Sequence, residues 1–210
     1  MFSKEKTRTI FLRLAGVSLG VLLVIVGGTF GPGPSPFAPP TEMAGAATPA
    51  PDGACQAVLD ASRKIFTLPF HFYFVHAGPD GKTTTTESIY VDGAAYTLVK
   101  GKWFRMPVSS DDMKGLTQES LKNVKNVSCH VVRDEMVNGE IATVYSVHSE
   151  TERGIHDGQA WISKSKGVLL REETDTQMPG ESGKRHASLR LEYNNVRAPT
   201  SYEDLYAPKR

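Results

Sequence analysis

The chain reads Met136-Val-Asn-Gly-Glu-Ile-Ala-Thr-Val-Tyr-Ser-Val-His-Ser149 and, ten residues later, Gln159-Ala-Trp-Ile-Ser-Lys-Ser-Lys-Gly-Val-Leu-Leu-Arg-Glu-Glu173. Apolar and polar side chains alternate along these segments, as in strands with one buried face. Asn138-Gly139 is a strong signal for a two-residue hairpin turn, and Lys164 to Gly167 forms a second polar turn. We therefore expect a long antiparallel meander with one apolar face and one solvent-facing side.

Similar strand patterns occur on both sides of this stretch. Before it, we predict strands at 70–76, 83–91, 94–99, 103–106 and 127–132, and after it a strand at 187–193. Helical spacing of apolar residues predicts a helix from Asp52 to about Phe66 and a second at 110–123. The expected fold class is α+β: a curved antiparallel half-barrel of about eight to nine strands, with the two helices covering its concave face.

The first 30 residues read as a membrane-directed segment. Lys4, Lys6, Arg8 and Arg13 precede an uncharged apolar run at 14–30. A basic flank followed by such a run is a secretory signal peptide or an N-terminal membrane anchor. The run is short for a span of about 20 residues, which favours the signal peptide.

The cleavage site leaves both alternatives open. Ala44-Gly45-Ala46 has the small-x-small form, but it lies far downstream of the apolar run, beyond a Pro-rich stretch. We expect export to the periplasm, with a mature start at Ala47 or an uncleaved anchor in the inner membrane through residues 14–30.

Composition divides the rest of the chain. Residues 31–51 are rich in Pro, Ala and Gly and predict a disordered linker. The folded domain is expected at 52–199, followed by a tail at 200–210. Pro199 and Pro208 discourage regular structure from Arg197 onward. The chain carries 24 Lys+Arg and 23 Asp+Glu without a basic block, so nucleic acid is not an expected partner.

The chain has two cysteines, Cys55 and Cys129. An even number in an exported chain indicates a disulfide. A lipid on Cys55 is the rival interpretation, but Asp52-Gly53-Ala54 lacks an aliphatic residue at the expected place. Two unrelated buried thiols are a third alternative.

No catalytic constellation stands out. The six histidines form neither a His-Glu-x-x-His element nor a Cys/His cluster, so we expect no metal and no cofactor. His148 and His156 could approach each other across a hairpin. Glu172 and Glu173 are adjacent acids that a strand would turn to opposite faces, so they form no catalytic dyad. We therefore expect a protein that is not an enzyme.

Several turn and strand-edge motifs together resemble one superfamily. They are Asp92-Gly93-Ala94-Ala95-Tyr96, Lys102-Trp103, Val137-Asn138-Gly139, Trp161-Ile162-Ser163, Gly167-Val168-Leu169-Leu170-Arg171-Glu172 and Tyr193-Asn194-Asn195-Val196. Over roughly 52–199 the chain resembles the periplasmic lipoprotein-carrier half-barrel proteins (LolA/LolB/LppX-like). The resemblance implies an open antiparallel barrel, capped by helices, that binds acyl chains or other apolar ligands. No residue matches the arginine-centred lid of the carrier, so no functional residue is transferred.

The candidate ligand-binding residues are apolar positions of the predicted strands. They are Phe70, Phe72, Phe74, Tyr96, Trp103, Tyr145, Trp161, Leu170, Leu189 and Leu191. The same residue types would build an ordinary core, and the sequence alone does not separate the two roles. The expected function is binding or carrying a lipid or lipoprotein acyl chain in the cell envelope. The alternative is a membrane-tethered structural or interaction module with a solid core.

Overall fold

The computed structural model describes residues 52–77, 81–106, 111, 112, 115, 124–152 and 154–204. The predicted signal or anchor segment at 1–30 and the linker at 31–51 lie outside the described residues. The elements, in chain order, are α2 (Gly53–Lys64), the 3-10 helix η1 (Ile65–Thr67), β1 (Phe70–Ala77), β2 (Thr83–Val91), β3 (Ala94–Val99), β4 (Lys102–Met106), β5 (Val124–Val137), β6 (Glu140–Thr151), β7 (Gly154–Ser163), β8 (Leu169–Gln177), β9 (Lys184–Glu192) and β10 (Glu203–Asp204).

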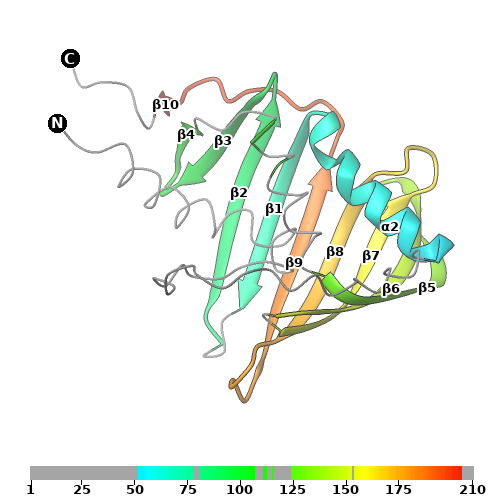
Figure 1. The fold of residues 1–210 in the computed structure, drawn as a ribbon. Helices are drawn as coiled ribbons and strands as arrows, with labels where there is room; N and C mark the ends of the chain where they lie inside the picture. The colour runs from blue at the N-terminus through cyan, green and yellow to red at the C-terminus, as the bar shows by residue number, and fades with distance from the viewer. Residues whose placement is uncertain are drawn as a thin grey trace, which may run out of the picture.

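The strands form one ten-stranded sheet in the order β10-β4-β3-β2-β1-β9-β8-β7-β6-β5 (Figure 1). Two meanders, β1 to β4 and β5 to β9, join where β1 pairs with β9. Every pairing is antiparallel except the short parallel contact of β10 with β4. The predicted open, mostly antiparallel sheet is confirmed.

The strand count is one higher than the prediction because of β10, which lies in the tail that the prolines were expected to keep irregular. Its two residues run beside β4, and the ring of Tyr202 packs edge-on against Tyr96 at 5.0 Å between centroids. A two-residue strand that contains neither Pro199 nor Pro208 is compatible with both prolines.

Tight turns set the register of the hairpins. Asn138 and Gly139 have φ angles of 51° and 79°, which a two-residue hairpin turn with left-handed backbone requires. Asp92-Gly93 and Lys100-Gly101 adopt the same conformation. The hairpin turn predicted at Asn138-Gly139 is confirmed.

The first predicted helix is confirmed as α2. Asp52 caps it: its side-chain oxygen accepts a hydrogen bond of 2.8 Å from the backbone N–H of Cys55. Arg63 and Lys64 lie in the last turn, where positive charge is favourable. A disulfide joins Cys55 of α2 to Cys129 of β5, which confirms the predicted bridge.

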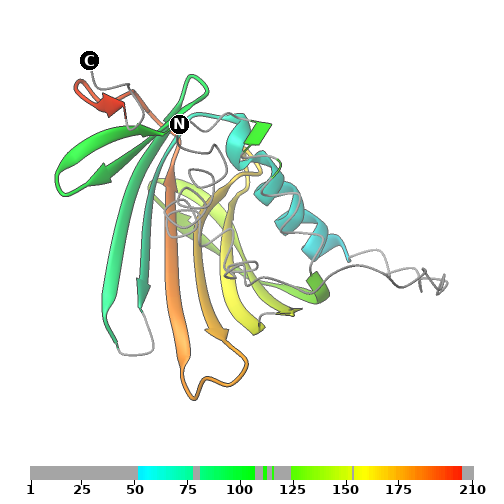
Figure 2. The ribbon, with the colours of Figure 1, turned by 60° about the vertical axis from the view of Figure 1, so that its left-hand side comes forward.

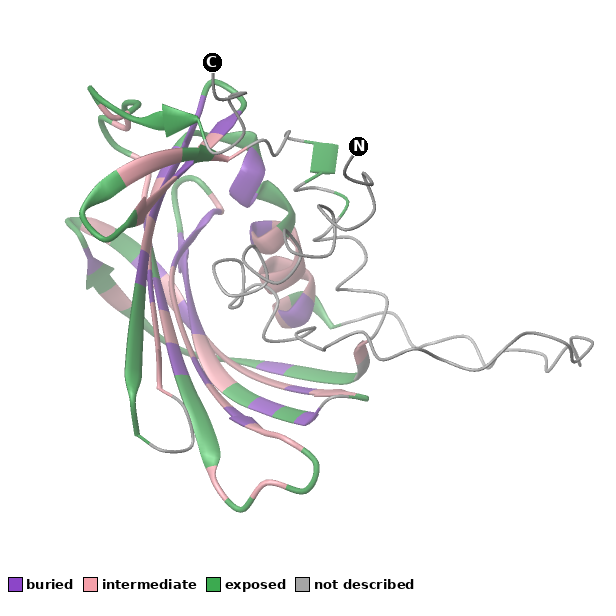
Figure 3. Cartoon of the chain, turned by 90° about the vertical axis from the view of Figure 1, so that its left-hand side faces the viewer, coloured by how far each residue is buried: buried purple, intermediate pink, exposed green. Residues whose placement is uncertain are grey.

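The sheet curls, and α2 lies on its concave side (Figures 2 and 3). Ala61, Ile65 and Phe66 of α2 and η1 are buried in one cluster with apolar side chains of β1, β2, β7, β8 and β9. This cluster is the main core, and it lies between the helix and the sheet.

The structure describes only three residues of the second predicted helix, 110–123. These are Asp111, Asp112 and Gly115, and all three are helical. A second covering helix therefore stays a prediction. Within the described ranges, no helix is long and apolar enough to span a bilayer.

Candidate functional site

The concave side of the sheet, here called the inner face, is the candidate site. Cross-strand register shows which side chains share it with the main core. Its apolar members on the strands are Phe70, Phe72, Phe74, Tyr90, Ala95, Tyr145, Val147, Ala160, Ile162, Leu169, Ala187, Leu189 and Leu191.

The inner face is larger than its cover. α2 has 12 residues, so it is about 18 Å long and about 10 Å across. Ten strands spaced about 4.8 Å apart make a sheet about 43 Å wide. In the sheet, α2 lies against β5, β6, β7 and β8. Phe72, Tyr145, Val147 and Tyr193 pack against the core but remain only half-buried. Among the described residues, α2 is thus too small to cover the whole face, and part of its apolar surface stays accessible.

The ten predicted ligand-binding residues are divided between the two faces. Six of them lie on the inner face: Phe70, Phe72, Phe74, Tyr145, Leu189 and Leu191. The other four belong to separate clusters on the convex side, here called the outer face. Tyr96 is buried with Ile89, Val91 and Ala94, with Trp103 packed against them. Trp161 and Leu170 are buried with Val144 and its neighbours.

Strand parity explains this division. Trp161 lies between Ala160 and Ile162, which both point inward, so its own side chain points outward. A bulge between β7 and β8 follows the pair Trp161–Arg171, and Ile162 then pairs with Leu169. Leu170 is the extra residue and leaves the inner face. Its place depends on a bulge that no sequence pattern marks.

Glu172 interrupts the apolar inner face. It pairs with Leu189 of β9 and with Ala160 of β7. The Thr174 hydroxyl donates a hydrogen bond of 3.2 Å to its Oε1. Glu172 is half-buried by exposure. Loss of solvation at this position raises the pKa of its carboxyl from 4.5 to about 7, against the opposing effect of the hydrogen bond from Thr174. The sequence alone marks Glu172 only as one of two adjacent acids, and it does not predict this place on the inner face.

Gly158 of β7 lies opposite Thr174, beside Glu172. A Cβ there would lie 2.2 Å from the backbone oxygen of Glu173 and 3.1 Å from the Thr174 hydroxyl. We expect Gly158→Ala to lower the free energy of unfolding by about 2 kcal/mol, because β7 must move away from β8. Urea denaturation measures this loss.

The matched control for this variant is Gly183→Ala, since a Cβ at Gly183 meets nothing within 4 Å. It should change the stability by less than about 0.5 kcal/mol. Equal effects of the two changes would contradict a steric role for Gly158.

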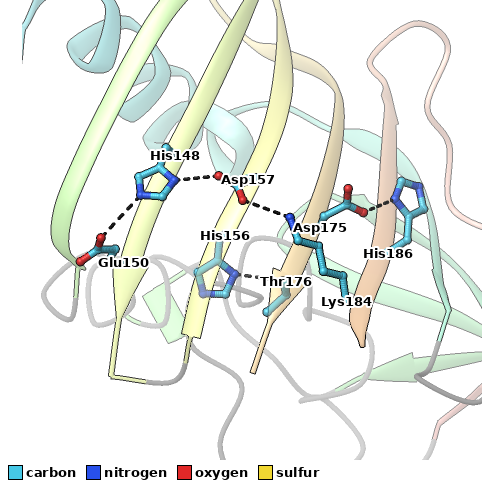
Figure 4. A network of polar contacts seen from close by, with 8 residues as sticks. All are labelled: His148, Glu150, His156, Asp157, Asp175, Thr176, Lys184 and His186. Atoms are coloured by element: carbon cyan, nitrogen blue, oxygen red, sulfur yellow. Dashed lines mark hydrogen bonds and ion pairs between the residues drawn. The ribbon is translucent and has the colours of Figure 1, made fainter. Parts of the chain in front are cut away.

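Charged side chains gather on the outer face (Figure 4). His148, Asp157, Asp175 and His186 are successive cross-strand partners on β6, β7, β8 and β9. His148 Nδ1 lies 2.7 Å from Asp157, and His186 Nδ1 lies 2.9 Å from Asp175. Asp157 raises the pKa of His148, and His148 lowers that of Asp157. All four are well exposed, so solvent screens these pairs.

His148 and His156, which by sequence could have approached each other across a hairpin, point to opposite faces. His156 is buried on the inner face, where its Nδ1 lies 3.0 Å from the Thr176 hydroxyl. Burial lowers the pKa of His156. In the part of the chain that the structure describes, no three His, Cys, Asp or Glu residues are placed to hold a metal ion.

Solved structures with a similar fold include LprF from Mycobacterium bovis, at 14% identity and a TM-score of 0.41, covering 73% of this chain and 98% of that one. The lipoprotein LppX of Mycobacterium tuberculosis is 11% identical, with a TM-score of 0.40 and coverage of 70% and 99%. A LolA superfamily protein from Nitrosomonas europaea is 9% identical, with a TM-score of 0.24 and coverage of 66% and 91%.

No family model and no curated protein matches the sequence. The solved structures include members of the group that the sequence motifs resemble, namely LppX and a LolA superfamily protein. At this level of similarity they assign no ligand, partner or activity to the chain.

Proposed function

We propose that the protein is an exported binding protein of the cell envelope, without catalytic activity, that holds an apolar ligand against its inner face. The ligand class is a lipid or the acyl chain of a lipoprotein. A basic, apolar N-terminal segment and a disulfide fit an oxidising compartment such as the periplasm.

The half-buried apolar side chains inside the fold carry this proposal. A solid two-layer core would bury Phe72, Tyr145 and Val147 as completely as it buries Ile65 and Leu191, which are each 1% exposed. Accessible apolar surface next to a core favours binding of an apolar ligand. Each ligand methylene group that is buried against this surface contributes about 0.8 kcal/mol to the binding free energy. Six of the sequence-predicted residues lie on this face and are the proposed contacts.

Delipidated protein should bind a pyrene-labelled monoacylglycerol saturably, with a micromolar dissociation constant measured by fluorescence. Val147→Asp should weaken this binding at least about tenfold, because it places a charge among the apolar contacts. Ile155→Asp is the matched control: Ile155 is 43% exposed on the outer face of β7, and its replacement should leave the affinity unchanged. No saturable binding by folded protein would overturn the proposed function.

A further inference from the structure

Glu172 lies in the middle of an apolar row that crosses five strands. Phe74, Leu189, Glu172, Ala160 and Tyr145 are successive cross-strand partners on β1, β9, β8, β7 and β6. Of the described residues on the inner face of β1, β2 and β6 to β9, Glu172 is the one acid. Its place is therefore the centre of the surface that the proposed function assigns to the ligand.

Among the described residues, no cation pairs with this carboxyl. Within the described part of the chain, the Thr174 hydroxyl is its hydrogen-bond partner, and Arg171 and Lys166 pair with Glu173 and Glu140 instead. Titratable or charged side chains on the elements around it are Tyr145 of β6, His156 of β7, Arg185 of β9, His76 of β1, and Asp60, Arg63 and Lys64 of α2. Asp60 is engaged by Arg63 on the exposed side of α2, and His156 by Thr176. None of these groups shifts the pKa of Glu172, whose rise to about 7 comes from burial.

The inner face changes character at Glu172. On one side lie apolar side chains such as Leu169, Ile162 and Leu191. On the other side, four buried residues are polar, and they lie beside the buried Ala187: Thr174, Thr176, Ser149 and His156. An amphipathic molecule placed along the strands would thus have its polar group near Glu172 and its chain over the apolar part.

We propose that Glu172 positions the head of an uncharged acyl ester, its protonated carboxyl donating a hydrogen bond to an ester oxygen while the acyl chain lies over Phe74, Leu189 and Tyr145. This proposal rests on the proposed function. A ligand that displaces water from Glu172 favours the neutral carboxyl still further. A neutral carboxyl is a hydrogen-bond donor, and its complement is an acceptor rather than an ammonium group.

The test is the affinity for pyrene-labelled monoacylglycerol between about pH 5.5 and about pH 8.5. If only the protonated form binds, affinity should fall about 30-fold across this range. Glu172→Gln keeps a donor without a charge, so its affinity should stay at the acidic wild-type level throughout. Glu173→Gln is the matched control: Glu173 lies on the outer face beside Arg171, and its replacement should leave the wild-type pH dependence intact.

A second comparison isolates the hydrogen bond from the charge. Wild-type protein near pH 5.5 should prefer the ester about tenfold over a pyrenyl alkane of equal length, and Glu172→Leu should remove that preference. Wild-type affinity that does not change with pH, or a pH dependence that survives Glu172→Gln, would overturn the assignment and leave the proposed function standing. Failure of both probes to bind at any pH would instead remove the proposed function. Tighter binding of a pyrenyl alkylammonium as pH rises would assign a cationic ligand and also overturn the proposal.

Discussion

Replacing Cys55 and Cys129 together by alanine should lower the free energy of unfolding by about 4 kcal/mol. The two cysteines are 74 residues apart in sequence, and closing a loop of that length restricts the unfolded chain by an amount of this size. A single domain is stable by only about 5–15 kcal/mol. The bridge therefore supplies a large share of the stability.

The folded structure adds to this expectation. The disulfide ties α2 to β5, the last strand in the order of the sheet. Both cysteines are almost completely buried, at 1% and 2% exposure. Without the bridge, α2 would be held to the inner face by its apolar side chains alone, and we expect it to detach first.

Urea denaturation of the double variant measures the loss, and wild-type protein treated with a reductant is the control for the substitutions themselves. Amide hydrogen exchange should show the backbone of α2 losing protection before that of β8 and β9. A stability loss under about 1 kcal/mol in both samples would contradict a main role for the bridge.

Local features of the fold were predictable because they depend on neighbouring residues. Asn138-Gly139 specifies its turn whatever surrounds it, and Asp52 caps α2 through its own side chain. The pairing of β1 with β9 is different. Phe72 pairs with Leu191, which is more than half of the chain away in sequence. The sequence of neither strand indicates which strand it pairs with. The order of the strands thus needed the structure.

The candidate site was predictable only in its apolar half. Alternation in 187–193 placed Leu189 and Leu191 on one face, as found. Tyr96, Trp103, Trp161 and Leu170 could not be separated from them, because the outer face also buries large side chains. The opposite orientations of Glu172 and Glu173 followed from strand geometry. Which of the two points inward depended on the register of β8 with β9.

Replacing Glu172 by glutamine should raise the free energy of unfolding by about 3 kcal/mol at about pH 8 and change it little at about pH 4. Burial raises the pKa of the carboxyl from 4.5 to about 7 in the folded protein. The neutral carboxyl is compatible with its apolar surroundings, so its full contribution to the stability of the fold is present below pH 4.5. This contribution to stability is lost as pH rises through 7, since the folded protein must then carry a poorly solvated charge on the half-buried Glu172. Glutamine has a similar shape and never ionises.

Thermal and urea unfolding of Glu172→Gln, Glu173→Gln and wild-type protein at both pH values test this expectation. Glu173 lies beside Arg171 and is part-exposed, so its replacement should change stability by less than about 1 kcal/mol at either pH. Equal stability of Glu172→Gln and wild-type protein at pH 8 would show that the carboxyl is hydrated in the folded state. A higher free energy of unfolding for Glu172→Gln at pH 8 would mean that the ionised Glu172 carboxyl destabilises the folded protein from the centre of an apolar face. Such a local conflict with packing is typical of a functional group, so the gain would favour a ligand-binding role for Glu172 over a structural one.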